Sequence, residues 1–205
     1  MIDFICRASA GGKLMTNPKN SKDALSKTTQ SYLQEWLKEA IYGVKKEIST
    51  KEINKGLEYE DQAIAKVIEW LDLPFVIKNK TRFTDEFFTG EPDILMSDTV
   101  IDIKNSWDCW TFPLFDNEIP TIDYEYQVQI YMHLTGLKKA KVVYVLLNTP
   151  ETKYTPEIDY SHVNPIFRVK EFNFEYDEEI INKLKTRVLA AREYIKTLQN
   201  DFNIN

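Results

Sequence analysis

The stretch GEPDILMSDTVIDIKNSW, residues 90–107, contains Asp93, Asp102 and Lys104 in a run that is otherwise apolar enough for a pair of core strands. Another acid in the stretch, Asp98, has a structural explanation, because the SDT sequence around it is typical of a turn between two β-prone runs. Asp93, Asp102 and Lys104 have no such explanation, so their residue types and spacing make them candidates for a chemical role.

Side chains alternate across a strand, so Asp102 and Lys104 are expected on one face and Ile101 and Ile103 on the other. Asp93, at the start of the preceding strand, can lie beside them across the hairpin. Two nearby carboxylates repel each other unless a lysine or a divalent metal lies between them. Because Mg²⁺ takes one or two protein carboxylates together with water and phosphate oxygens, the hairpin predicts a magnesium site.

A third acid is expected from the preceding helix. In LEYEDQAIAKV, residues 57–67, Glu60 is four residues before Ile64 and therefore on the stripe that should face the sheet. Glu58 and Asp61 lie off that stripe. A change of helix phase by one residue would exchange Glu60 for Glu58.

The alternative is that the hairpin charges are only solvated. The sequence contains a second acid-x-Lys pattern, Glu151-Thr152-Lys153, directly after Pro150. That copy lies in a polar loop without hydrophobic neighbours, whereas residues 100–104 lie in an apolar strand. This difference separates the hairpin from the second copy, but the pattern taken alone still favours a solvated hairpin face over a metal site, and the motifs elsewhere in the chain shift that balance.

Hydrophobic periodicity predicts an α/β fold, with a mixed central β-sheet flanked by helices. Residues 1–20 are expected to form a short ordered segment followed by a loop. The expected elements are helices at 21–50 (broken near Gly43), 57–71, 123–134 and 178–199, strands at 75–83, 142–148 and 167–174, the hairpin 92–105, and an irregular loop at 150–165.

Composition limits the function classes. The chain has 205 residues, of which 43% are hydrophobic, which suits one domain. A net charge of −6 argues against a protein that coats nucleic acid through bulk charge, but a local basic channel is compatible with it. Lysines cluster at 13–27, 38–55, 78–82, 138–141 and 183–196.

The remaining features indicate a cytoplasmic protein without a membrane segment. Cys6 and Cys109 are too few for a disulfide scaffold, a four-cysteine zinc site or an iron–sulfur cluster, so a reducing compartment fits. No apolar run approaches the roughly 20 residues that span a bilayer, and the N-terminus does not resemble a signal peptide. His133 and His162 are isolated, and neither is assigned a ligand role.

Four motifs together resemble a known family. GLEYEDQA, GEPDIL, VIDIK and YQVQIYM occur in the order found in the PD-(D/E)xK nuclease superfamily, and more closely in the lambda-exonuclease-like (YqaJ-type) viral recombinase nucleases. The resemblance covers roughly residues 5–148. It implies a restriction-endonuclease-like core in one nuclease domain, with an N-terminal segment at 1–50, a catalytic core at 57–148, and an outer strand and C-terminal helix at 166–199.

The resemblance also implies roles for individual residues. Glu60 matches the family's helix acid, and Gln127 matches its helix glutamine. Asp93 and Asp102 match the two acids of the PD-(D/E)xK pattern, and Lys104 matches its lysine. Mg²⁺, with Mn²⁺ as the alternative, would be held by Asp93, Asp102 and the Ile103 carbonyl, with Glu60 acting directly or through water.

The segment ICRASAGGKL resembles the part of the family that grips the 5′-phosphate of DNA. Ser9 stands at the matching serine. Arg7 lies only two residues before it, closer than the family's basic residue, and is carried over as the phosphate-binding cation. Trp107 and Trp110, just past the hairpin, are expected either to stack on DNA ends or to belong to the core or an interface.

The resemblance implies a Mg²⁺-dependent 5′→3′ exonuclease that acts on double-stranded DNA ends. It would leave 3′ single-stranded DNA for a single-strand annealing partner in phage-type recombination, and would form a homotrimeric ring. The alternatives are a structure-specific or site-specific endonuclease of the same core, a catalytically inactive DNA-binding relative, and an unrelated α/β domain with solvated hairpin charges.

Overall fold

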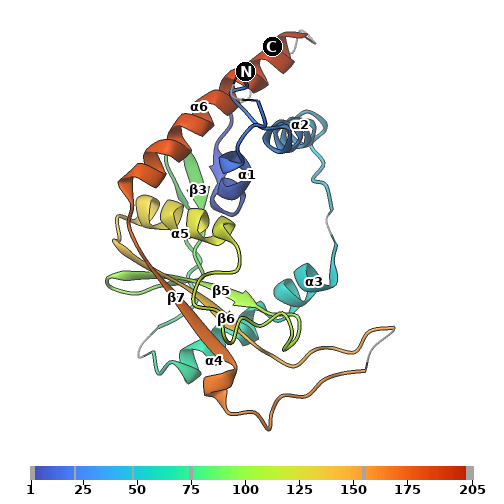
Figure 1. Ribbon diagram of the computed structural model, residues 1–205, viewed down its shortest axis with the longest axis vertical. Helices are drawn as coiled ribbons and strands as arrows, with labels where there is room; N and C mark the ends of the chain where they lie inside the picture. The colour runs from blue at the N-terminus through green and yellow to red at the C-terminus, as the bar shows by residue number, and fades with distance from the viewer. Residues whose placement is uncertain (1–2, 21, 48, 74–75, 154–155, 202–205) are drawn as a thin grey trace.

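The computed structural model describes residues 3–20, 22–47, 49–73, 76–153 and 156–201. A four-stranded sheet lies in the middle of the molecule, with its strands in the order β4-β5-β6-β7 (Figure 1). β5 and β6 are parallel, while β4 and β7 run antiparallel to their neighbours, so the predicted mixed sheet is confirmed. The strands are β4 (Ile94–Leu95), β5 (Thr99–Asn105), β6 (Lys139–Val145) and β7 (Val169–Glu175).

A second sheet of three short strands lies beside the N-terminal helices. β3 pairs with β1 in parallel and with β2 antiparallel. The strands are β1 (Cys6–Arg7), β2 (Phe83–Thr84) and β3 (Phe88–Gly90). Strands of this length are too short to show alternation in the sequence.

Helices cover both faces of the central sheet. On one face, α5 and α6 pack with α1 and α2 over residues such as Val100 and Val142 in the larger hydrophobic core. On the other face, α4 packs over Ile101 and Val143 in a smaller core. The helices are α1 (Gly11–Met15), α2 (Lys27–Tyr42), α3 (Lys51–Glu58), α4 (Glu60–Trp70), α5 (Ile122–Thr135) and α6 (Glu178–Asp201), with 3₁₀ turns at Ala8–Ala10 and Pro165–Phe167.

Most elements expected from periodicity are present. The hairpin turns at Met96, whose N–H donates to the Thr99 carbonyl at 2.9 Å. α2 ends at Gly43, which has a φ of 66°. α5, α6 and the outer strand β7 lie where they were predicted, and β6 is buried but ends at Val145 rather than at residue 148. Among the described residues, no helix is long and apolar enough to cross a membrane.

The single helix predicted at 57–71 is wrong. It is interrupted at Tyr59, where φ is −106° and ψ is 12°, so that α3 ends before it and α4 begins after it. The two helices have different partners, which explains the break. The stripe of α4 around Ile64 and Val67 packs on the sheet, whereas the buried residue of α3 is Lys55.

Two further expectations are corrected. The strand predicted at 75–83 is reduced to a bridge between Lys78 and Ile94 and to the start of β2; residue 75 lies outside the described residues. The Asn79 side chain accepts from the Thr81 N–H and donates to the Pro92 carbonyl, which turns the chain. The loop expected within 1–20 contains α1, which packs closely on α5.

Candidate active site

Three elements bring four of the predicted site residues together. Asp102 and Lys104 lie on one face of β5, and Gln127 reaches them from α5. Ile94 pairs with Ile101 in the hairpin, so Asp93, one residue before β4, lies opposite Asp102 on the same face.

Gln127 connects the acid to the lysine. Its Nε2 donates to Asp102 Oδ1 at 3.0 Å, and its Oε1 accepts from Lys104 Nζ at 3.1 Å. Lys104 Nζ also lies 2.8 Å from Asp102 Oδ2. The amide of Gln127 therefore contacts both charged groups, and its own side chain is buried.

Two tyrosines complete this network, and the sequence interpretation missed both. Tyr131 OH accepts from Gln127 Nε2 at 2.9 Å. The ring centroid of Tyr124 lies 4.2 Å from Lys104 Nζ. Their positions, three residues before and four residues after Gln127 on the same helix face, are the signal that could have identified them.

Burial and like charge perturb the two acids of the hairpin. Burial, together with the charge of Asp102, raises the pKa of Asp93 to about 7. The Ile103 N–H opposes this shift by donating to Asp93 Oδ2 at 2.6 Å. Burial would lower the pKa of Lys104, but the adjacent carboxylate of Asp102 outweighs it and raises that pKa. The cluster thus holds two close carboxylates and one ammonium.

The donor set fits a hard divalent cation. Asp102 Oδ2 is buried and makes no aligned hydrogen bond within the described residues, although Lys104 lies near it. The N–H and C=O of one strand residue point to the same edge, so the Ile103 carbonyl points toward the edge where its N–H meets Asp93. Two carboxylates and a carbonyl are oxygen ligands of the kind that Mg²⁺ prefers.

Glu60 stands apart from the four clustered residues. Its carboxylate lies 2.8 Å from Lys78 Nζ, and its side chain is 42% exposed. Its charge still contributes to the raised pKa of Asp93, so it lies within electrostatic reach. Glu58 is exposed at the end of α3. Across the described residues, no group of three acidic, histidine or cysteine side chains is placed to hold a metal.

The predicted phosphate-binding residues lie on the N-terminal segment. Arg7 and Ser9 are both exposed, and the 3₁₀ turn that contains Ser9 packs against α5. Lys13 Nζ lies 5.0 Å from the ring centroid of Tyr32. Burial raises the pKa of Tyr32, and the positive charge of Arg7 opposes this shift. Lys13 is therefore a second cation of this segment beside Arg7, and the sequence interpretation did not select it.

The two tryptophans after β5 have different surroundings. Trp107 is 7% exposed and packs within the fold, whereas Trp110 is 88% exposed. Both cysteines are free thiols, with Cys6 buried and Cys109 exposed.

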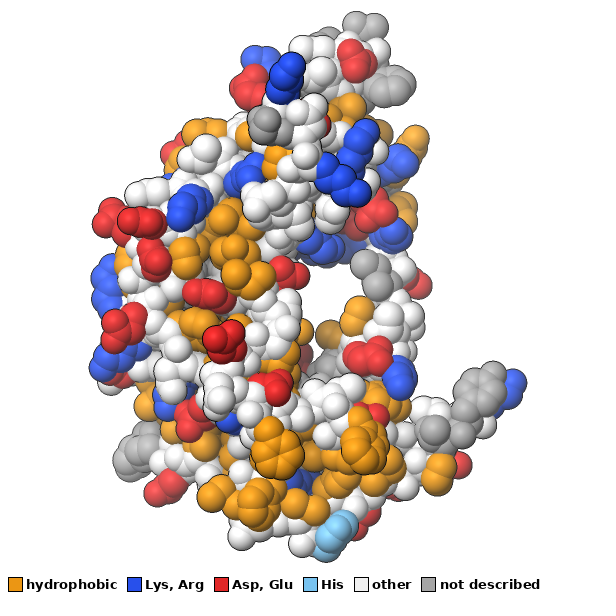
Figure 2. All heavy atoms as spheres, in the orientation of Figure 1, with side chains coloured by type: hydrophobic (Ala, Val, Ile, Leu, Met, Phe, Trp, Pro, Cys, Tyr) orange, Lys and Arg blue, Asp and Glu red, His pale blue; other side chains and the backbone are white. Residues whose placement is uncertain are grey.

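The elements that carry the site also frame an opening. α2 packs on α1, α1 on α5, α5 on β5, and β5 on α3. In Figure 1, the described residues 43–47 and 49–50 lie between α2 and α3 on the other side of the opening. Figure 2 shows the opening passing through the molecule, with Lys and Arg side chains gathered at its upper rim. The strand with Asp102 and Lys104 and the helix with Gln127 thus belong to its frame.

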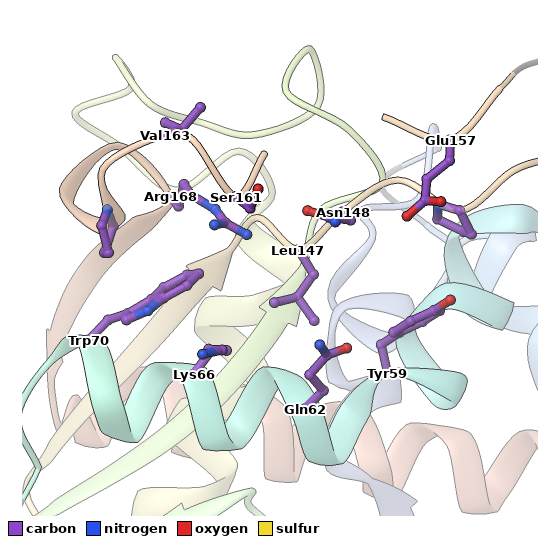
Figure 3. A pocket seen from close by; sticks show the side chains of 12 residues that line it. Tyr59, Gln62, Lys66, Trp70, Leu147, Asn148, Glu157, Ser161, Val163 and Arg168 are labelled. Carbon is purple, nitrogen blue, oxygen red and sulfur yellow. The ribbon is translucent and has the colours of Figure 1, made fainter. Parts of the chain in front are cut away.

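A polar pocket beside α4 lies away from the cluster. A cavity of about 480 Å³ lies between α4 and the segments 147–150 and 157–168, where the Arg168 guanidinium is 4.7 Å from the ring centroid of Trp70 (Figure 3). None of the four clustered residues lines it.

Comparisons with known proteins agree on the fold. No family model matches the chain, and no curated protein matches it by sequence. A phage-related exonuclease from Haemophilus somnus 129PT superposes with a TM-score of 0.85 at 29% identity, over 98% of this chain and 97% of that one. The alkaline exonuclease LHK-Exo from Laribacter hongkongensis superposes with a TM-score of 0.69 at 21% identity, over 97% and 94%. LHK-Exo in complex with dAMP gives a TM-score of 0.71 at 21% identity, over 97% and 93%.

The similarity extends over nearly the whole of both chains and includes the hairpin, β5 and α5. These elements are the ones that carry the four motifs and the clustered residues. The chain has the lambda-exonuclease-like (YqaJ-type) nuclease fold of the PD-(D/E)xK superfamily.

Proposed function

We propose that the protein is a DNA exonuclease that hydrolyses phosphodiester bonds at the cluster formed by Asp93, Asp102, Lys104 and Gln127. The observation that carries the proposal is the meeting of Asp102, Lys104 and Gln127 in one bonded network. The similarity to a phage-related exonuclease over 98% of this chain supports the same reaction class.

The proposed enzyme depends on Mg²⁺, with Mn²⁺ as the alternative. Asp93, Asp102 and the Ile103 carbonyl would hold the ion. Glu60 would leave its ion pair with Lys78 and contact the ion through water. When bound, the ion lowers the pKa of water and neutralises charge on the phosphate.

The protein's own groups have separate tasks in this reaction. Lys104 donates from its ammonium to the attacking water and to the phosphate oxygens on which negative charge develops. Gln127 fixes that ammonium through its Oε1 and restrains Asp102 through its Nε2. The ring of Tyr124 covers Lys104 and limits the directions from which water can reach it.

We propose 5′→3′ polarity on double-stranded ends, because the N-terminal segment that carries Arg7 and Ser9 packs through its 3₁₀ turn and α1 on α5, the helix that carries Gln127. Arg7 and Ser9 would bind the 5′-phosphate, and their exposure leaves them accessible to DNA. The product would be 3′ single-stranded DNA for a single-strand annealing partner in phage-type recombination in the cytoplasm.

We also propose a homotrimeric ring, which would place DNA in a shared basic channel despite the net charge of −6. Analytical ultracentrifugation should therefore give three times the 24.1 kDa chain mass. A fully active species with the mass of one chain would contradict the ring.

Substrate geometry tests the exonuclease assignment. Linear duplexes with 5′-phosphate or 5′-hydroxyl ends and a closed circular duplex of the same sequence are incubated with the protein and Mg²⁺. The proposal expects loss of the linear duplex from its 5′ ends, faster with 5′-phosphate, and an intact circle. Nicking of the circle would instead identify an endonuclease, and binding without cleavage of any substrate would identify an inactive DNA-binding relative.

A further inference from the structure

A buried lysine attaches α3 to the body of the protein. Lys55 is 1% exposed and is the buried residue of this helix. Its Nζ donates to the carbonyls of Ser106 at 2.8 Å, Trp107 at 2.8 Å and Leu147 at 2.9 Å. An ammonium has three hydrogens, so all of them are used. These carbonyls lie just past the ends of β5 and β6.

Apolar packing contributes little to this attachment. None of residues 51–58, all of which the structure describes, belongs to either hydrophobic core. The apolar residues Ile53 and Leu57 are 40% and 70% exposed. In the chain that leads to α3, residues 43–47 and 49–50 are exposed. The charged contacts of Lys55, with Lys51 Nζ 4.8 Å from the Trp107 ring centroid, are therefore the main attachment.

Burying an ammonium costs free energy unless it is fully hydrogen-bonded, and a leucine would dock a helix without that cost. Burial lowers the pKa of Lys55 to about 8, although the negative charge of Asp108 opposes this shift. The ammonium is therefore protonated at neutral pH. An attachment made of polar groups can exchange with water, whereas an apolar contact cannot. Elements held in this way are among the first to open locally.

We propose that α3 is a clasp that closes the opening of one subunit around the DNA strand that enters it from the shared channel, and that Lys55 is the positioning residue that holds the clasp shut. The inference rests on the proposed function, because it takes the opening as the path by which DNA reaches Lys104. Ser106 directly follows the strand that carries Lys104, so the clasp and the catalytic cluster share one support. Release of α3 would open the ring between α3 and β5 and leave both cores intact.

Hydrogen exchange tests the attachment without relying on activity. Lys55→Met is compared with wild type and with Lys183→Met, a lysine on α6 whose side chain is 65% exposed. Since hydrogen bonds to a charged group are each worth about 1.5–3 kcal/mol, the amides of residues 51–58 should exchange at least about tenfold faster in Lys55→Met alone. The circular dichroism should not change. Unaltered exchange in α3 would overturn the proposal.

Kinetics separate a positioning role from a catalytic one. For Lys55→Met, KM for a long duplex should rise, and nucleotides released per encounter should fall, each by on the order of tenfold, because one lost charged contact has that value. The rate on thymidine 5′-(4-nitrophenyl phosphate), a small diester that needs no clasp, should stay at the wild-type value. An equal loss on both substrates would overturn the clasp. If wild type cleaves neither, the proposed function fails, while hydrogen exchange still decides the attachment.

Chemical rescue tests whether charge or volume matters. Lys55→Cys is made with Cys109→Ser, which removes the exposed thiol and leaves the buried Cys6. Alkylation with 2-bromoethylamine rebuilds an ammonium of lysine length, and 2-bromoethanol gives a neutral side chain of the same length. Slow exchange of α3 and a low KM should return only with the ammonium. Recovery with both reagents would overturn the assigned role.

Discussion

Asp102 is the residue at which the contacts of the cluster converge. It faces Asp93 across the hairpin, lies 2.8 Å from Lys104 Nζ, and accepts from Gln127 at 3.0 Å. Strand alternation and the hairpin predicted that Asp93, Asp102 and Lys104 would meet, and the resemblance to the nuclease family implied that Gln127 would join them. Tyr124 and Tyr131 lie at helical spacing from Gln127, but this spacing alone does not distinguish a tyrosine of the site from one packed in the core. The ion pair of Glu60 with Lys78 depends on how a loop folds back, which no local pattern specifies.

Replacing Gln127 with Met should uncouple the acid from the lysine. The change removes the donor to Asp102 Oδ1 and the acceptor of Lys104 at nearly constant volume. We expect kcat to fall by roughly 10- to 100-fold, the range typical of losing a positioned polar group, while the Kd for DNA in EDTA stays constant. Steady-state kinetics measures kcat, and fluorescence anisotropy measures the Kd for DNA. A weakened Kd with constant kcat would show that Gln127 binds substrate instead.

The raised pKa of Asp93 predicts how stability depends on pH in the metal-free protein. The pKa of Asp93 is about 7 in the folded state, compared with an ordinary value of 3.8. Between these two pH values, the folded state therefore binds more protons than the unfolded state. Stability is then highest below the ordinary value and falls as pH rises to about 7, because the unfolded chain ionises without penalty. Urea unfolding in EDTA measures the free energy of unfolding at pH 5 and at pH 7.5. Between these pH values, this free energy should fall more for wild type than for Asp93→Asn. Equal losses in the two proteins would contradict the shift.

At the scale of elements, β5 divides the molecule into two faces. Its alternation places Val100 and Asp102 toward α5, and Ile101 toward α4. The hydrophobic pattern of a long amphipathic segment such as α6, or of a fully apolar one such as β6, matches the element that forms. These elements were therefore predictable from the sequence. The break at Tyr59 was not, because helical hydrogen bonds continue on both sides of it and only the different partners of α3 and α4 separate them.

Gly90 on β3 controls how closely the small sheet approaches α5. A Cβ at this position would lie 2.6 Å from Tyr131 Cε1, so Gly90→Ala must displace that ring and, through it, Gln127. We expect destabilisation of about 1–3 kcal/mol from overpacking, together with a loss of kcat. Gly56→Ala is the matched control, since its Cβ would meet nothing within 4 Å. It should stabilise α3 by about 0.5–1 kcal/mol, because alanine is the better helix former.

Urea unfolding and steady-state kinetics check the two glycine variants. An active, fully stable Gly90→Ala protein would show that Tyr131 can move without affecting the site. Destabilisation by Gly56→Ala would show that α3 has a close neighbour at that position.

At the scale of the whole molecule, a ring of packed elements surrounds an opening (Figure 2). Asp102, Lys104 and Gln127 of the proposed catalytic cluster lie on two of these elements, β5 and α5. Composition alone could indicate only that a local basic region was compatible with a net charge of −6. The opening itself depends on contacts between residues far apart in the chain, such as those of Lys55 with Ser106 and Leu147. Long-range contacts of single polar groups leave no periodic signal in a sequence.

The central claim is that Lys104 and its neighbours cleave phosphodiester bonds. The most direct measurement is single-turnover release of nucleotides from a 5′-phosphorylated linear duplex in Mg²⁺, for wild type, Lys104→Ala and Lys139→Ala, an exposed lysine beside the same hairpin. The account predicts that Lys104→Ala binds the duplex in EDTA with a Kd near that of wild type but releases nucleotides at least about 100-fold more slowly, as expected for loss of a group that stabilises transition-state charge. Lys139→Ala should match wild type. Undiminished release by Lys104→Ala would contradict the account.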